Sequence, residues 1–131
     1  AEFVYRAFQE YRFRYNLYEE KTHESYLDNT IMIDVGGEVV GQLMVTYEWS
    51  DWRNGMIWWI QSVYVHGDYR RSGVFSALYR HVESNARQDP EVCGIRLYVE
   101  RGNERAQRTY ESLGMGMTDY RVMQSMFTGD E

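Results

Sequence analysis

The sequence predicts one mixed α/β domain built on a mainly antiparallel sheet. Three observations support this: strand patterns joined by two tight turns cover residues 30–65, a helical pattern follows at once, and a further strand and helix come next. With 131 residues, 44% of them hydrophobic, the chain is long enough for one packed core and short for two. We therefore expect a single domain over residues 1–131, with the order β-β-β-α-β-α-β from residue 30 onward.

The first three strands are marked by their turns. The run "TIMIDV", residues 30–35, is followed by Gly36-Gly37 and then by "EVVGQLMVTYEW", which predicts a hairpin with a two-glycine turn. Asn54-Gly55 marks a second tight turn before a strand over residues 56–65. Because that third strand carries large apolar residues on both faces, we expect it in the middle of a sheet that helices cover on both faces.

Two helices and two strands are expected in the second half. Val74, Leu78 and Val82 recur at helical spacing within residues 72–88. Residues 94–100 have a strand pattern, and residues 103–115 predict a helix with Asn103 at its start and Gly114 past its end. The segment "MTDYRVMQSMF", residues 117–127, alternates weakly and predicts a last strand or one half of a hairpin.

Residues 1–29 carry two competing patterns. Aromatic and apolar residues recur at helical spacing from Val4 to Tyr18, yet Tyr11, Phe13, Tyr15 and Leu17 alternate with polar residues as in a strand. We favour a helix over residues 1–20.

Composition excludes several classes of function. A formal net charge of −6 and a pI near 5.1 argue against a nucleic-acid partner bound through a broad basic face. Cys93 is the only cysteine, so no intrachain disulfide can form, and no metal site is suggested. No apolar run is long enough to span a membrane and no signal peptide is evident, so we expect a cytoplasmic protein without a membrane partner. His23 and His81 are interpreted as solvated helix residues.

The stretch "HGDYRRSGVF", residues 66–75, joins the predicted central strand to a helix and suits an anion. Unpaired amides of the first helical turn, together with the positive end of the helix dipole, attract negative charge, and Gly73 permits close approach of a phosphate. Arg70 and Arg71 would add charge-assisted hydrogen bonds, so a diphosphate is the best match. The alternative is that both arginines merely begin an amphipathic helix and remain solvated. The spacing matches neither the P-loop nor the dinucleotide-binding glycine motif.

Two blocks of the sequence resemble the GNAT acetyltransferase superfamily. The family's Arg/Gln-x-x-Gly-x-Gly/Ala signature corresponds to Arg70, Arg71, Ser72, Gly73, Val74 and Phe75. The later block "LYVERGNERAQRTYESLGM" matches at Asn103, Ala106, Tyr110, Leu113 and Gly114, with Met115 where Phe is usual. The resemblance covers about residues 30–120 and implies a GNAT-type sheet.

The resemblance implies transfer of an acetyl group from acetyl-coenzyme A to a primary amine of a small molecule or peptide, by direct attack. It places the pantetheine arm along Val63, Tyr64 and Val65, and the diphosphate on the amides of residues 71–75. It also places Asn103 against the coenzyme and makes Tyr110 the general acid for the departing thiolate. The general base is left open among Glu48, Asp51, His66 and Glu100, with Gln61 able to position a water. An aromatic cluster near the second turn would face the acceptor; it comprises Tyr47, Trp49, Trp52, Trp58 and Trp59.

Three departures from the family pattern matter. Phe75 replaces a small residue, Gly67 stands where a proline is common, and 29 residues before the hairpin are short for the family's first strand and helices. If residues 1–20 are helical, that first strand is missing, and the exposed sheet edge makes a homodimer a reasonable hypothesis. A catalytically inactive acyl-coenzyme A binding or dimerising module is therefore the alternative function. An interaction protein that binds no coenzyme is a third.

Overall fold

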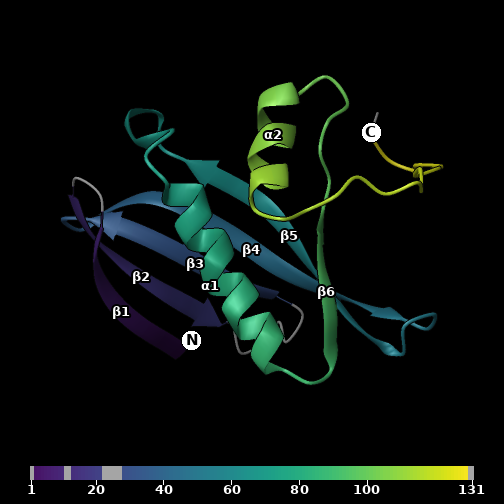
Figure 1. Cartoon of the computed structure of the whole chain (residues 1–131), viewed down its shortest axis with the longest axis horizontal. Helices are drawn as coiled ribbons and strands as arrows, with labels where there is room; N and C mark the ends of the chain where they lie inside the picture. The colour runs from purple at the N-terminus through teal and green to yellow at the C-terminus, as the bar shows by residue number, and fades with distance from the viewer. Residues whose placement is uncertain (1, 11–12, 22–27, 130–131) are drawn as a thin grey trace. The chain divides into compact units, whose positions relative to one another are not determined.

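The computed structural model describes residues 2–10, 13–21 and 28–129. They belong to two compact units, one ending at Tyr98 and the other beginning at Val99. Figure 1 shows the elements of each. Neither of the helices among these residues is long and apolar enough to cross a membrane.

The first unit is a six-stranded sheet in which the strands follow one another in chain order (Figure 1). The strands are β1 (Glu2–Glu10), β2 (Phe13–Lys21), β3 (Asp28–Val35), β4 (Glu38–Ser50), β5 (Gly55–Val65) and β6 (Val92–Leu97). Neighbouring strands are antiparallel except β5 and β6, which are parallel. This confirms the predicted mixed, mainly antiparallel sheet. Both predicted turns also form, with φ of 61° and 90° at Gly36 and Gly37 and 50° at Asn54.

The helix expected over residues 1–20 is wrong, because this segment forms strands β1 and β2. Strand β2 pairs with β3 from Asn16↔Asp34 to Lys21↔Asn29, and β1 covers the other edge of β2. Burial follows the strand period: Tyr15, Leu17 and Glu19 are buried, whereas the residues between them are only half-buried. The alternation of apolar and polar residues therefore overrides the helical spacing. The unpaired edge of β3 that suggested a dimer is occupied by β2.

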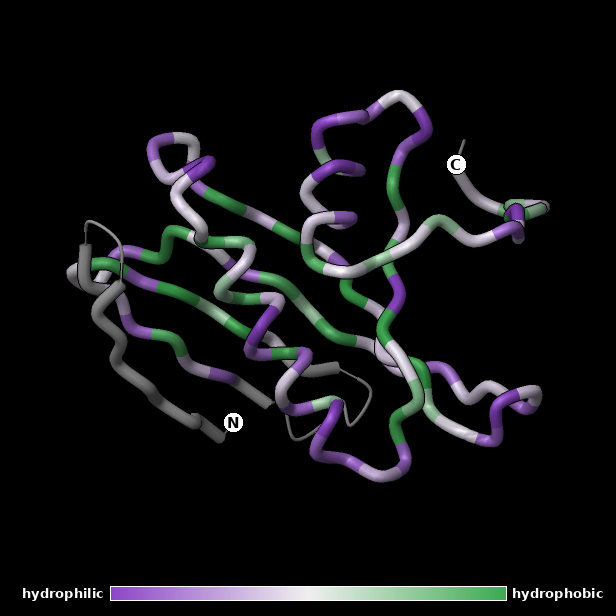
Figure 2. The backbone as a smooth tube through the Cα atoms, in the orientation of Figure 1, coloured by the Kyte–Doolittle hydropathy of each residue, from purple (hydrophilic) through white to green (hydrophobic). Residues whose placement is uncertain are grey.

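Helix α1 (Val74–Gln88) packs across one face of the sheet and closes the main core (Figure 1). Its apolar residues recur at the predicted spacing, and Figure 2 colours hydrophobic residues as green bands on the α1 tube, with further green bands along the strands. The core contains Leu17, Ile31, Ile33, Val40, Leu43, Val45, Ile57, Ile60, Val74, Leu78 and Val82. Ile57 and Ile60 lie on opposite faces of β5 and are each only 3% exposed, which agrees with an interior strand.

The second unit contains helix α2 (Glu104–Ser112), as predicted. Asn103 caps its start by accepting a hydrogen bond from the Ala106 amide at 3.1 Å. Gly114 follows its end with φ of 99°. The predicted last strand is wrong, since no helix or strand forms in the described residues after Leu113. The alternating pattern of this tail finds no partner strand there, and its large apolar side chains are exposed.

Candidate active site

Strand β5 carries a β-bulge two to three residues before its end at Val65. Gln61 pairs with Met44 and Tyr64 pairs with Gln42, so Ser62 and Val63 together lie opposite Leu43. Ser62 has a positive φ of 54°, the backbone conformation that accommodates the extra residue. A bulge redirects the backbone amides and side chains around it and is often found beside active sites.

Beyond the bulge, β5 is paired on one side only. Its parallel pairing with β6 ends at Ile60↔Leu97, whereas β5 continues to Val65 along β4. Val63 and Tyr64 are correspondingly exposed. Within the part of the chain that the structure describes, residues 61–65 therefore present a free strand edge toward β6. An extended ligand arm with amide groups can pair with such an edge as an added strand.

The loop after β5 is a compact turn with two left-handed residues. A short 3₁₀ helix, η1 (Gly67–Tyr69), is capped by His66, whose Nδ1 accepts a hydrogen bond from the Asp68 amide at 3.1 Å. Arg71 and Gly73 then adopt positive φ angles of 64° and 86°. Gly73 is the N-terminal cap of α1 and supplies no side-chain hydrogen bond to the helix.

Four amides of this loop and helix start are left without an acceptor. Among the described residues, the backbone N–H groups of Arg71, Gly73, Val74 and Ser76 donate to no carbonyl or side chain. The Ser72 amide is used within the turn, where it donates to the Tyr69 carbonyl at 3.3 Å. Unpaired amides at a helix N-terminus, next to left-handed residues, form an anion-binding cradle.

The two arginines of the loop differ in their surroundings. Arg70 Nε donates to the Val65 carbonyl at 3.3 Å and so ties the loop to the end of β5. Arg71 is exposed and makes no hydrogen bond or ion pair within the described residues. Arg71 is therefore the cation available to a phosphate, while Arg70 also has a structural role.

Sequence reasoning missed a glycine that allows α1 to approach the sheet here. Gly41 pairs with Val65, and a Cβ on Gly41 would overlap the Cγ1 atom of Val74. Only glycine therefore lets the first residue of α1 sit directly on β4 beside the free edge of β5. Together, the free edge, the amide cradle and Arg71 fit an extended ligand that ends in a diphosphate.

The chain matches one protein family over most of its length. The model of the acetyltransferase (GNAT) family matches residues 1–115 of the chain. The chain belongs to the GNAT acetyltransferase family. It is thus an N-acetyltransferase by family, and the family's acyl donor is acetyl-coenzyme A. No curated protein matches the chain.

Solved structures show the same fold as this GNAT chain. A possible acetyltransferase from Clostridium difficile 630 is 43% identical, with a TM-score of 0.71 and coverage of 80% of this chain and 69% of that one. A transcriptional regulator from Bacillus halodurans C-125 is 24% identical, with a TM-score of 0.69 and coverage of 79% and 69%. The structure of AAC(6')-Iy with the bisubstrate analogue CoA-S-monomethyl-acetylneamine is 12% identical, with a TM-score of 0.69 and coverage of 80% and 73%.

The other two predicted site residues lie on α2, in the second unit. Asn103 uses its side-chain oxygen as the helix cap, and its Nδ2 group donates no hydrogen bond within the described residues. Tyr110 follows seven residues later, about two helical turns, which places it on the same side of α2. Burial raises the pKa of the Tyr110 phenol above its ordinary value, so the phenol remains protonated at neutral pH.

The four candidates for the general base differ in their surroundings. The Asp51 carboxylate accepts from the Trp52 amide in the β4–β5 turn, and His66 caps η1. Glu100 lies in the second unit. Glu48 lies on β4 beside Trp59, with one carboxylate oxygen held by two donors. Gln61 donates to the Thr46 hydroxyl at 2.6 Å and is fixed next to the bulge, as positioning a water would require.

The predicted aromatic cluster is divided between two faces of the sheet. Tyr47 and Trp58 meet edge to face with ring centroids 5.7 Å apart and line a hollow of about 700 Å³ beside the end of α1. Trp59 lies on the opposite face, because side chains alternate along β5. Trp52 projects from the turn and is 91% exposed. The hollow contains none of the coenzyme-binding residues predicted from sequence.

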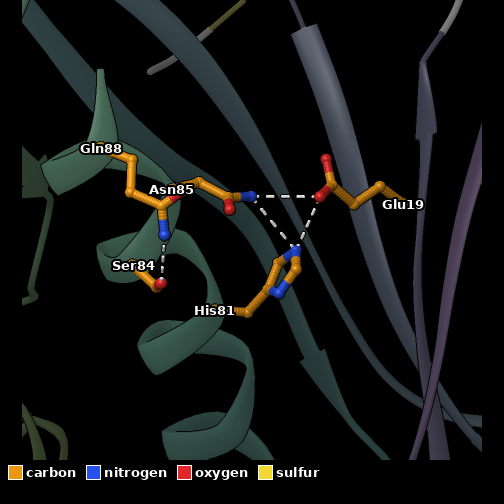
Figure 3. A network of polar contacts seen from close by, with 5 residues as sticks. All are labelled: Glu19, His81, Ser84, Asn85 and Gln88. Atoms are coloured by element: carbon orange, nitrogen blue, oxygen red, sulfur yellow. Dashed lines mark hydrogen bonds and ion pairs between the residues drawn. The ribbon is translucent and has the colours of Figure 1, made fainter. Parts of the chain in front are cut away.

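The interpretation of His81 as a solvated residue is wrong. Its Nε2 lies 2.7 Å from Glu19 Oε2, with side-chain exposures of 9% and 8%, and Asn85 Nδ2 donates to the same oxygen at 3.1 Å (Figure 3). This network fastens α1 to β2. Sequence reasoning missed this network, because residues 1–20 were expected to be helical. His23 lies outside the described residues, and no metal-binding group of His, Cys, Asp and Glu occurs among those described.

Proposed function

We propose that this chain transfers the acetyl group of acetyl-coenzyme A to a primary amine of a small molecule or peptide by direct attack. The observation that carries the proposal is the corner at the end of β5, where four unpaired amides and Arg71 adjoin a free strand edge. When bound, acetyl-coenzyme A supplies an activated thioester, so the enzyme needs no covalent nucleophile.

The residues of the corner would hold the coenzyme along its length. The edge of β5 at Val63, Tyr64 and Val65 would pair with the amides of the pantetheine arm. The loop from Arg71 to Phe75 would bind the diphosphate through its amides, with charge from Arg70 and Arg71. On α2, the uncommitted Nδ2 group of Asn103 would donate to the coenzyme.

The chemistry would be a simple exchange of bonds. The amine nitrogen forms a bond to the acetyl carbon, and the bond from that carbon to sulfur breaks. The backbone amides redirected by the bulge at Ser62 and Val63 would stabilise the negative charge that develops on the carbonyl oxygen. Tyr110 would donate its proton to the departing sulfur, and a water positioned by Gln61 would take the proton lost from nitrogen.

Binding of acetyl-coenzyme A, measured by calorimetry, tests the corner directly. We expect saturable binding that Arg71→Ala weakens by about tenfold or more, as expected for losing a charged hydrogen bond. Arg70→Ala should remove less of the electrostatic attraction to the coenzyme than Arg71→Ala does. It should also loosen the loop, because the hydrogen bond from Arg70 Nε to the Val65 carbonyl is lost.

Arg53→Ala is the matched control, because Arg53 lies in the β4–β5 turn at the other end of β5. It should bind acetyl-coenzyme A like the parent protein. An absence of binding at millimolar coenzyme, or equal effects of all three arginine variants, would refute the proposed site. Binding without turnover of any amine would instead support the inactive binding module.

A further inference from the structure

A second group of side chains lies on the face of the sheet opposite α1. We call Glu48, Trp59, Arg96 and Tyr98 the Glu48 cluster; they come from β4, β5, β6 and the residue after β6. Trp59 pairs with Thr46 on one side and Arg96 on the other, so its side chain and that of Arg96 share this face. The neighbouring Trp58 points to the α1 face, where it lines the hollow with Tyr47.

The cluster fixes a carboxylate at the edge of an aromatic platform. Trp59 Nε1 donates to Glu48 Oε1 at 2.7 Å, and an Arg96 guanidinium nitrogen lies 3.5 Å from the same oxygen. The rings of Trp59 and Tyr98 stack with centroids 4.7 Å apart and an interplanar angle of 32°. These two contacts fix the direction of the carboxylate.

The second oxygen of the Glu48 carboxylate remains available to a ligand. Within the described residues, both polar contacts of Glu48 go to Oε1, and Oε2 has none. The Glu48 side chain is 49% exposed and Tyr98 is 65% exposed. A half-exposed carboxylate beside the exposed Tyr98 ring offers an ammonium group both an ion pair and a cation–π contact.

We propose that the Glu48 cluster binds a second ammonium group of the acceptor, so that the preferred acceptors are diamines or oligoamines. The inference rests on the proposed acetyl transfer and adds the class of acceptor. The cluster is less suited to a carboxylate of the acceptor, because Arg96, its one cation, is already engaged. Arg96 is only 27% exposed and already shares Glu48 Oε1, whereas Glu48 retains a free oxygen.

The strand geometry sets the spacing between the two amines. Trp59 precedes the bulge at Ser62 and Val63 by three to four residues, which is about 10–13 Å at roughly 3.3 Å per residue. An α,ω-diamine of about eight carbons covers that distance with carbon–carbon bonds of about 1.5 Å in an extended chain. Shorter diamines would not reach both the reacting position and the cluster.

The experiment compares 1,8-diaminooctane with 8-amino-1-octanol, which has the same length but one amine. We expect kcat/KM, corrected for the two equivalent ends of the diamine, to be five- to tenfold higher for the diamine, mainly through KM. Glu48→Gln keeps a side-chain oxygen for the Trp59 indole but removes the charge, and it should bring the ratio close to one. Glu38→Gln, at an exposed glutamate at the start of β4, should keep the ratio of the parent enzyme.

Two results would overturn the inference. One is an equal kcat/KM for the diamine and the amino alcohol in the parent enzyme. The other is an equal loss for both substrates in Glu48→Gln, which would assign Glu48 to the reacting amine instead. If neither amine is acetylated, that result contradicts the proposed function but does not test the inference about the Glu48 cluster. Calorimetric affinities of the parent protein and Glu48→Gln for the two amines then decide the inference, since preferential diamine binding must depend on Glu48.

Discussion

Gly41 lies directly beneath Val74, so close that a methyl group on Gly41 would overlap the Val74 side chain. Gly41 also pairs with Val65, the last residue of β5. One position on β4 therefore sets both the distance of α1 from the sheet and its placement beside the free edge of β5. The proposed coenzyme site depends on this contact, although Gly41 itself has no reactive group.

Gly41→Ala should therefore damage coenzyme binding from within the sheet. The added methyl must push the start of α1 outward, at a cost of about 1–3 kcal/mol in the free energy of unfolding. We expect the Kd for acetyl-coenzyme A to rise by about tenfold. Gly67→Ala is the control, because a Cβ on Gly67 meets nothing within 4 Å. Equal Kd values for the two variants would show that the close approach of α1 is not required.

Tyr110→Phe should lower kcat and leave coenzyme binding intact. Loss of a general acid typically costs a factor of about 10² to 10⁴ in rate. The Kd for acetyl-coenzyme A should stay within about twofold, because phenylalanine keeps the packing of the ring. Tyr120→Phe, at an exposed tyrosine of the same unit, should have parent kinetics. An unchanged kcat in Tyr110→Phe would remove this residue from the mechanism.

The pH dependence of kcat should show the titration of the half-buried Tyr110 phenol. Burial raises the pKa of Tyr110 above its ordinary value of about 10, and a general acid works only while protonated. Tyr110 should therefore cause no loss of kcat up to about pH 10 and a fall at higher pH. Rate measurements across pH 7 to 11 would test this, within the range where circular dichroism shows the fold to be intact. A fall assigned to Tyr110 at neutral pH would contradict the direction of the shift.

Glu19→Ala should destabilise the first unit by leaving His81 and Asn85 without their buried acceptor. Removing one partner of a buried hydrogen bond costs about 1–3 kcal/mol in the free energy of unfolding. Glu19→Gln keeps one acceptor oxygen and should therefore lower the free energy of unfolding by less than Glu19→Ala does. Urea unfolding of both variants gives the comparison. Parent stability in Glu19→Ala would mean that the network of Figure 3 does not fasten α1 to β2.

Glu83 should make a small contribution to stability that disappears in acid. Hydrogen bonds from Arg80 and Arg87 lower the pKa of Glu83 below its ordinary value, against a weaker opposing effect of burial. Its ionised form therefore stabilises the folded state above about pH 4.5, and the contribution is lost as pH falls through the lowered pKa. At pH 7, Glu83→Gln should cost at most about 0.5 kcal/mol per lost pair. The difference should vanish in unfolding measurements near pH 3, and a difference that grew in acid would contradict the assignment.

The sequence by itself determined the elements whose signals are local. The turn residues Gly36, Gly37 and Asn54 marked the hairpins, and the spacing of Val74, Leu78 and Val82 marked α1. The arginine–glycine loop after β5 and the later block over residues 97–115 together identified the family, because each block is a run of consecutive residues.

Tertiary structure decided whatever depends on partners far apart in the chain. Residues 1–20 carry both helical and strand periods, and pairing of β2 with β3 selects the strand. The tail has a strand pattern but no partner strand among the described residues, so the pattern alone was not enough. The close approach of Gly41 to Val74, the buried Glu19–His81 network and the Glu48 cluster all join residues from different elements. Local propensity says nothing about such contacts, because they exist only once the sheet has fixed which side chains share a face.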